Sequence, residues 1–118
     1  MPKVLVVDDE PLLGMSLSLY LQRKGCEVEV LDSGSAALTV LEQRSFDIGF
    51  FDINMPRVTG ASLAGTVREK WPGMRVVLMT GEIDDGEIEE KMRGLDDVLV
   101  LRKPFDLDEL QRLVFAQN

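Results

Sequence analysis

Val4-Leu5-Val6-Val7-Asp8-Asp9 is the stretch that decides the fold: four apolar residues lead directly into two carboxylates. Three later apolar runs lead in the same way to a polar residue: Ile48-Gly49-Phe50-Phe51 to Asp52, Val76-Val77-Leu78-Met79 to Thr80, and Val98-Leu99-Val100-Leu101-Arg102 to Lys103. Short, almost purely apolar runs of this kind predict strands that are covered on both faces, as in a parallel sheet. All of these polar groups would then emerge at one edge of the sheet, where open α/β folds bind ligands.

A fifth run has a different pattern. Glu27-Val28-Glu29-Val30, which leads into Leu31, alternates polar and apolar residues, so we expect a strand over Val28–Leu31 with one face towards water, at an edge of the sheet. The segments between the runs have the spacing of amphipathic helices. The expected helices cover residues 11–24, 33–44, 59–70 and 84–93, and a last one that starts at Asp106. Gly60 and Gly65 weaken the helical pattern of the third segment.

Strand and helix therefore alternate five times, with short links. This alternation predicts right-handed crossovers and a parallel sheet with helices on both faces. Five units are too few for an eight-stranded barrel, so the sheet is open, and a strand order of 2-1-3-4-5 places Asp8, Asp9 and Asp52 together. We expect residues 1–118 to form one domain with one core.

Composition excludes several classes of function. The net charge of −8 argues against direct binding to nucleic acid. The apolar runs are far shorter than the roughly 20 residues that span a bilayer, and the start of the chain lacks a signal peptide, so we expect a cytoplasmic protein without membrane contact. Cys26 is the only cysteine, which excludes an internal disulfide, and the absence of histidine excludes a phosphohistidine carrier.

The residues at the expected sheet edge suggest a cation and a phosphoryl group. Three clustered carboxylates repel one another unless a cation is present, and Mg²⁺ prefers oxygen ligands of this kind. Lys103 can neutralise a carboxylate or a phosphoryl oxygen, and Thr80 offers a hydroxyl. Each residue taken singly also fits a helix cap, a turn or a solvated side chain. Four strand ends that carry complementary groups together favour the functional interpretation.

The chain resembles the receiver domains of two-component response regulators. The resemblance covers essentially the whole chain and rests on Leu5-Val6-Val7-Asp8-Asp9-Glu10, Asp52-Ile53-Asn54-Met55-Pro56 with Gly60, Thr80-Gly81 and Lys103-Pro104-Phe105. It implies a flavodoxin-like (CheY-like) fold and a signalling switch without turnover of an external substrate. It also implies that a sensor histidine kinase or a histidine phosphotransfer protein donates the phosphoryl group.

The resemblance further implies a role for each site residue. Asp52 would accept the phosphoryl group, while Thr80 and Lys103 would hold its oxygens. The implied Mg²⁺ (or Mn²⁺) ligands are Asp9, Asp52 and the backbone carbonyl of Asn54, with Asp8 acting largely through water, and the Lys103–Pro104 bond would be cis. The implied switch and output face includes Thr80, Val100 and Phe105.

Val100 stands where the family usually has an aromatic switch residue, so the switch would rest on backbone movement. For this reason, a phosphorylation-independent pseudo-receiver that acts as a protein-binding module is the main alternative. The output partner or domain, stand-alone status and homodimerisation on phosphorylation are left open.

Two enzyme or carrier classes fit less well. Phosphatases with an aspartyl-phosphate intermediate usually carry a second acid two residues after the nucleophile, where this chain has Asn54. A flavin or nucleotide carrier would need glycines after the first strand to cradle phosphate, and this chain has none there.

Overall fold

The computed structural model describes residues 1–81, 85–95 and 97–116 of the chain. Within these residues, five strands alternate with five helices, in the order β1 (Lys3–Val7), α1 (Pro11–Arg23), β2 (Glu27–Leu31), α2 (Gly34–Leu41), β3 (Ile48–Asp52), α3 (Gly60–Lys70), β4 (Arg75–Thr80), α4 (Asp85–Lys91), β5 (Leu99–Arg102) and α5 (Leu107–Phe115). The strands form one parallel sheet in the order β2-β1-β3-β4-β5. The predicted fold class and strand order are therefore confirmed.

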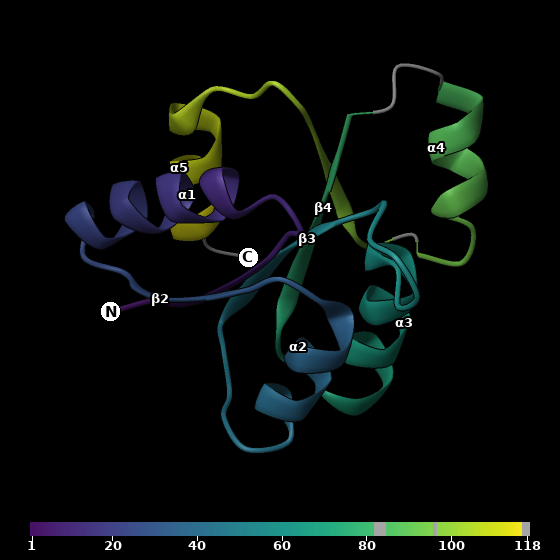
Figure 1. Ribbon diagram of the computed structural model, residues 1–118, viewed down its shortest axis with the longest axis horizontal. Coiled ribbons are helices and arrows are strands. Elements are labelled where there is room, and N and C mark those ends of the chain that lie inside the picture. The colour runs from purple at the N-terminus through teal and green to yellow at the C-terminus, as the bar shows by residue number, and fades with distance from the viewer. Residues whose placement is uncertain (82–84, 96, 117–118) are drawn as a thin grey trace.

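The helices cover both faces of the sheet, as Figure 1 shows, with α1 and α5 together on one face and α2 and α3 on the other. Alternate residues of the central strands belong to two separate apolar clusters, one on each face of the sheet. Leu5, Val7 and Phe51 pack towards the α2 and α3 side, whereas Val6 and Phe50 pack towards the α1 and α5 side. This two-sided burial explains why the central strands read as continuous apolar runs.

The strand β2 lies at an edge of the sheet and is only partly buried, in agreement with its alternating sequence. Several ends differ from the expected ones by a few residues. The largest difference is in α2, which ends at Leu41 rather than at residue 44, because the chain leaves the helix in a turn through Glu42 and Gln43. The strand β5 starts at Leu99, one residue later than expected.

The ends of the helices show why these boundaries hold. Ser33 and Thr59, expected inside helices, are instead the N-caps of α2 and α3, and each side chain accepts a hydrogen bond from a backbone N–H three residues on. Gly25 follows α1 with a φ of 90°, in the left-handed region where glycine is favoured.

The helix α4 begins at Asp85 in the described part of the chain, while residue 84 of the expected helix lies outside the described residues. Cys26 is buried, with 6% of its surface exposed. None of the helices among the described residues is long and apolar enough to cross a membrane.

Candidate functional site

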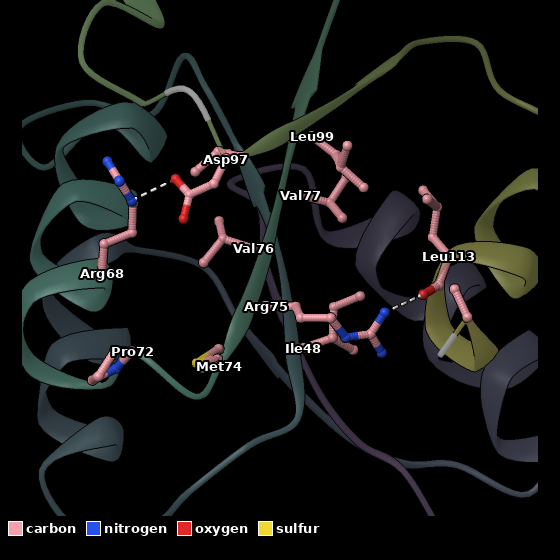
Figure 2. Close-up of a pocket in the computed structure, with 12 residues that line it drawn as sticks. Ile48, Arg68, Pro72, Met74, Arg75, Val76, Val77, Asp97, Leu99 and Leu113 are labelled. Atoms are coloured by element: carbon pink, nitrogen blue, oxygen red, sulfur yellow. Dashed lines mark hydrogen bonds and ion pairs between the residues drawn. The ribbon is translucent and has the colours of Figure 1, made fainter. Parts of the chain in front are cut away.

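A hollow between α3, α5 and the sheet lies away from the predicted site. This pocket of about 450 Å³ is lined by the first residues of several strands, such as Ile48 and Arg75 (Figure 2). It therefore opens at the opposite end of the sheet from the carboxylates, which lie at the ends of their strands. Its arginines serve the fold. Arg68 forms an ion pair with Asp97 at 2.7 Å, and Arg75 donates to the backbone carbonyl of Leu113 at 2.8 Å. The chemistry must be sought at the other edge.

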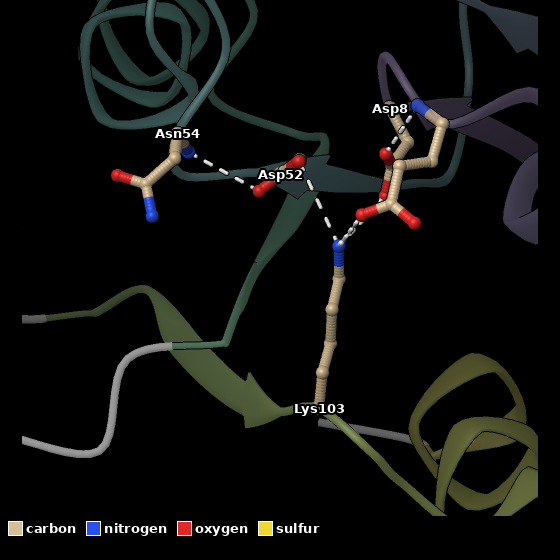
Figure 3. A network of polar contacts seen from close by, with 5 residues as sticks. Asp8, Asp52, Asn54 and Lys103 are labelled. Carbon is tan, nitrogen blue, oxygen red and sulfur yellow. Dashed lines mark hydrogen bonds and ion pairs between the residues drawn. The ribbon is translucent and has the colours of Figure 1, made fainter.

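The ends of the strands deliver the predicted residues to that other edge. Asp8 directly follows β1, Asp52 is the last residue of β3, and Lys103 directly follows β5 (Figure 3). Thr80 is the last residue of β4 and lies one position beyond Met79, the partner of Asp52 in the sheet register. Parallel strands therefore bring residues far apart in sequence to one site.

The three predicted carboxylates form a cluster. One oxygen each from Asp8, Asp9 and Asp52 can be chosen such that all three lie within 4.8 Å of one another. The side chains of Asp8 and Asp52 are buried, and Asp9 is exposed. The predicted convergence of these residues is confirmed. Such a set of oxygen donors, open to solvent on the Asp9 side, fits a hard divalent cation that keeps some of its water.

Lys103 supplies the positive charge of the site. Its Nζ lies 3.1 Å from Asp8 Oδ2 and 3.6 Å from Asp52 Oδ2 (Figure 3). Burial acts to lower the pKa of Lys103, but the hydrogen bond to Asp8 and the nearby carboxylates outweigh it, so the net shift raises the pKa. The ammonium therefore stays charged at neutral pH.

Glu10 is a neighbour that the sequence interpretation left out of the site. Its carboxylate lies 3.8 Å from the Lys103 Nζ, and its backbone N–H donates to Asp8 Oδ1 at 2.9 Å. The position of Glu10 directly after the acidic pair was the available signal. Its carboxylate adds a fourth acidic group to the surroundings of the Lys103 ammonium.

Asp52 is held by its own loop. The backbone N–H of Asn54 donates to Asp52 Oδ1 at 3.1 Å, which leaves the second oxygen facing Lys103. Burial is the main influence on the pKa of Asp52 and raises it; the bond from Asn54 and the charge of Lys103 only partly oppose this. A cation bound beside Asp52 would favour its ionised form.

The predicted switch residues are placed differently from one another. Thr80 is fully buried, and its backbone carbonyl accepts a hydrogen bond from the Lys103 N–H at 2.7 Å. Val100 is partly buried and pairs with Leu78 in the register, while Phe105 packs against the apolar cluster on the α1 and α5 side. Thus the backbones of Thr80 and Lys103 adjoin, and Phe105 lies beyond them on the α1 and α5 side of the sheet. The Lys103–Pro104 bond is cis, as the resemblance implied.

Residues 4–115 match the family of response regulator receiver domains, and the chain belongs to this family. The response regulator protein FleR of Pseudomonas aeruginosa is 40% identical over 114 residues, which are 95% of this chain and 24% of FleR. The chain thus spans about a quarter of that relative's length. Receiver domains have histidine kinases as partners, and the domain is a signalling module rather than an enzyme that turns over an external substrate.

Two solved structures extend the similarity to the fold. The response regulator TrrA from Thermotoga maritima, solved in complex with Mg²⁺-BeF, has a TM-score of 0.81 and 32% identity, and the match covers 97% of this chain and 96% of TrrA. The chemotaxis response regulator CheY4 of Vibrio cholerae has a TM-score of 0.84 and 32% identity, over 96% of this chain and 98% of CheY4.

Proposed function

We propose that this domain accepts a phosphoryl group on Asp52 from a phosphohistidine of a sensor histidine kinase or a histidine phosphotransfer protein. The observation that carries the proposal is the buried Asp52 carboxylate, which lies beside Asp8 and Asp9 and has one oxygen 3.6 Å from the Lys103 ammonium. An Asp52 oxygen forms the new bond to phosphorus, the phosphorus–nitrogen bond breaks, and its electron pair leaves with the partner's imidazole.

The acidic cluster holds the cation for this transfer, in this proposal Mg²⁺ or Mn²⁺. Asp9, Asp52 and the backbone carbonyl of Asn54 would hold it directly and Asp8 largely through water, which fits the two Asp8 oxygens that already accept from the Glu10 N–H and the Lys103 Nζ. When bound, the cation neutralises charge on the transferring phosphoryl group. The structure of TrrA with Mg²⁺-BeF supports the same choice of cation.

Lys103 and Thr80 hold the phosphoryl oxygens. Lys103 already lies between two carboxylates, so its ammonium can move towards a phosphoryl group on Asp52 over a short distance. Thr80, next to Asp52 at the strand ends, supplies the hydroxyl. These contacts draw the end of β4 towards Asp52. They shift the equilibrium between two conformations of the surface that includes Thr80, Val100 and Phe105.

In this proposal residues 1–118 act as one cytoplasmic receiver unit, either alone or as the N-terminal domain of a longer protein. The cognate kinase, the output partner and a phosphorylation-dependent homodimer are not specified by it. A pseudo-receiver that binds partners without phosphorylation is the second candidate, and Val100 favours it, because valine offers neither a ring nor a hydroxyl to follow Thr80.

Mass spectrometry of the intact protein tests the assignment. The protein is incubated with acetyl phosphate or phosphoramidate, with Mg²⁺ or with EDTA, beside Asp52→Asn. Asp32→Asn, at an exposed position, is the matched control. We expect a phosphate-sized, Mg²⁺-dependent gain in mass that persists in the control and is lost in Asp52→Asn. Labelling that survives in Asp52→Asn contradicts the role of Asp52, and cation binding without any labelling supports the pseudo-receiver.

A further inference from the structure

A hydrogen bond joins α4 to the loop that carries the proposed cation ligand. The Lys91 Nζ donates to Asn54 Oδ1 at 2.7 Å, across 37 positions of sequence. Lys91 is the last residue of α4, and Asn54 lies two residues after Asp52. The bond therefore links a peripheral helix to the immediate surroundings of the phosphoacceptor.

Asn54 contacts both ends of this link. Its backbone N–H donates to Asp52 Oδ1 at 3.1 Å, and its side-chain oxygen accepts from Lys91. A cation or phosphoryl group that changes the charge and orientation of the Asp52 carboxylate acts directly on the Asn54 peptide. A movement of this peptide then reaches Lys91 through the Asn54 side chain, which has only two rotatable bonds.

The described side chains of α4 are mostly exposed. Ile88 is buried, with 7% of its surface exposed, whereas Glu87, Glu89 and Glu90 are exposed. Figure 1 shows α4 at the periphery of the molecule. A short helix that buries one apolar side chain among those described is easily repositioned, so a polar link at its last residue can help to set its position.

We propose that Lys91 is a positioning residue that couples the phosphorylation site to α4 through Asn54. The inference rests on the proposed function, because the coupling begins at Asp52. It gives this chain a route to α4 that requires neither Val100 nor an aromatic side chain. Because coupling is reciprocal, the position of α4 also biases the Asn54 loop.

Two-dimensional amide NMR of the full chain tests the coupling, with Mg²⁺ and beryllium fluoride as the probe that stands in for the phosphoryl group. Lys91→Met removes the donor, and Lys91→Arg retains one. Lys70→Met is the matched control, because Lys70 also lies in the last turn of a helix and donates to Glu42 at 2.7 Å.

We expect the probe to shift the resonances of residues 52–54 and of α4 in the wild type and in Lys70→Met. In Lys91→Met the shifts at 52–54 should persist, while those of α4 fall by a factor of about two to five, the range expected for an exposed charged link. Lys91→Arg should restore them, and adding Asn54→Ala to Lys91→Met should cause no further loss in α4.

Equal α4 shifts in Lys91→Met and Lys70→Met would overturn the inference while leaving the proposed function intact. If the wild type showed no shift at 52–54, both the proposed function and the coupling would be overturned. The two failures are thus read from different resonances of the same spectra.

Discussion

Replacing Gly60 by alanine should destabilise the domain and disturb the site, although alanine is the better helix former. Gly60 is the first residue of α3 and is buried against the end of β3. A Cβ at this position would meet the backbone carbonyl oxygen of Asp52, and would lie 2.6 Å from its carbonyl carbon and 2.9 Å from the Cα of Ile53. These are backbone atoms, so no side-chain rotation relieves the contact.

The magnitude follows from two opposing terms. Forced overpacking costs about 1–3 kcal/mol, and three close backbone contacts place this site towards the upper end. The gain in helix propensity from glycine to alanine offsets about 0.5–1 kcal/mol of it. We therefore expect Gly60→Ala to lower the free energy of unfolding by about 1–2 kcal/mol.

Gly65 provides the matched control in the same helix. A Cβ at Gly65 would have no other atom within 4 Å, so Gly65→Ala keeps only the favourable term and should raise the free energy of unfolding by about 0.5–1 kcal/mol. The two alanine variants, five positions apart in one helix, should thus change stability in opposite directions.

Urea unfolding of both variants measures the difference. Circular dichroism follows the helices, and the fluorescence of Trp71, the only tryptophan and the C-cap of α3, follows the end of that helix. Labelling of Asp52 by acetyl phosphate should fall in Gly60→Ala and not in Gly65→Ala, because a shift of α3 moves the Asp52 carbonyl. If Gly60→Ala proved as stable as Gly65→Ala, the close approach of α3 to β3 would be refuted.

Three further predictions concern charge, the thiol and the C-terminal helix. Without divalent cations, carboxyl-carbon NMR of Asp52 should give a pKa above that of a free aspartate, because burial raises it. The protonated carboxyl then stabilises the fold below the pKa of the unfolded state, and this stabilisation is lost as the pH rises through the pKa of the folded state. Metal-free Asp52→Asn should therefore melt at a higher temperature than the wild type at neutral pH but not in acid, and equal melting temperatures at neutral pH would count against this account. Burial likewise raises the pKa of the Cys26 thiol. At pH 8 a disulfide reagent should therefore modify Cys26 far more slowly in the folded protein than in the urea-unfolded chain, and equal rates would refute the burial of Cys26. Arg75→Met removes the two donors that reach the Leu113 and Val114 carbonyls at 2.8 and 2.9 Å, and should lower the free energy of unfolding by about 1–2 kcal/mol in thermal unfolding. Arg44→Met, which breaks an exposed ion pair with Glu29, should change the stability little. Equal effects of the two variants would argue against a role of Arg75 in capping α5.

The sequence was sufficient for the parts of the fold that depend on local patterns. Buried strands produce apolar runs and the edge strand β2 produces alternation, so both were predicted from their surroundings in the sheet. The predicted strand ends then determined which side chains lie at the same edge of the sheet. This correctly predicted that Asp8, Asp9 and Asp52 lie together. Predicting the cluster required only the topology, because parallel strands all end on the same side.

The features that the sequence did not reveal arise from contacts between distant segments. The helical pattern treated Gly60 and Gly65 alike as weak points, and the resemblance that included Gly60 gave no physical reason for it; the structure shows that a Cβ at Gly60 would meet the backbone at the end of β3, whereas one at Gly65 would not. The bond between Lys91 and Asn54 joins segments 37 residues apart, and no periodicity encodes it. The role of Arg75 as a cap for α5 likewise depends on where a distant helix ends.

The charges of the site explain why we expect it to bind a cation. Asp8, Asp52 and Glu10 each lie within 4 Å of the Lys103 Nζ, and Asp9 adds a further carboxylate to the cluster, so one ammonium faces four acidic groups. A phosphoryl group would add negative charge to the same place. Because like charges at this distance repel strongly when they are partly buried, we expect the proposed transfer to need a divalent ion at the site first. Lys103 alone therefore cannot balance the site, and its short contact with Asp8 must weaken when the phosphoryl oxygens compete for the same ammonium.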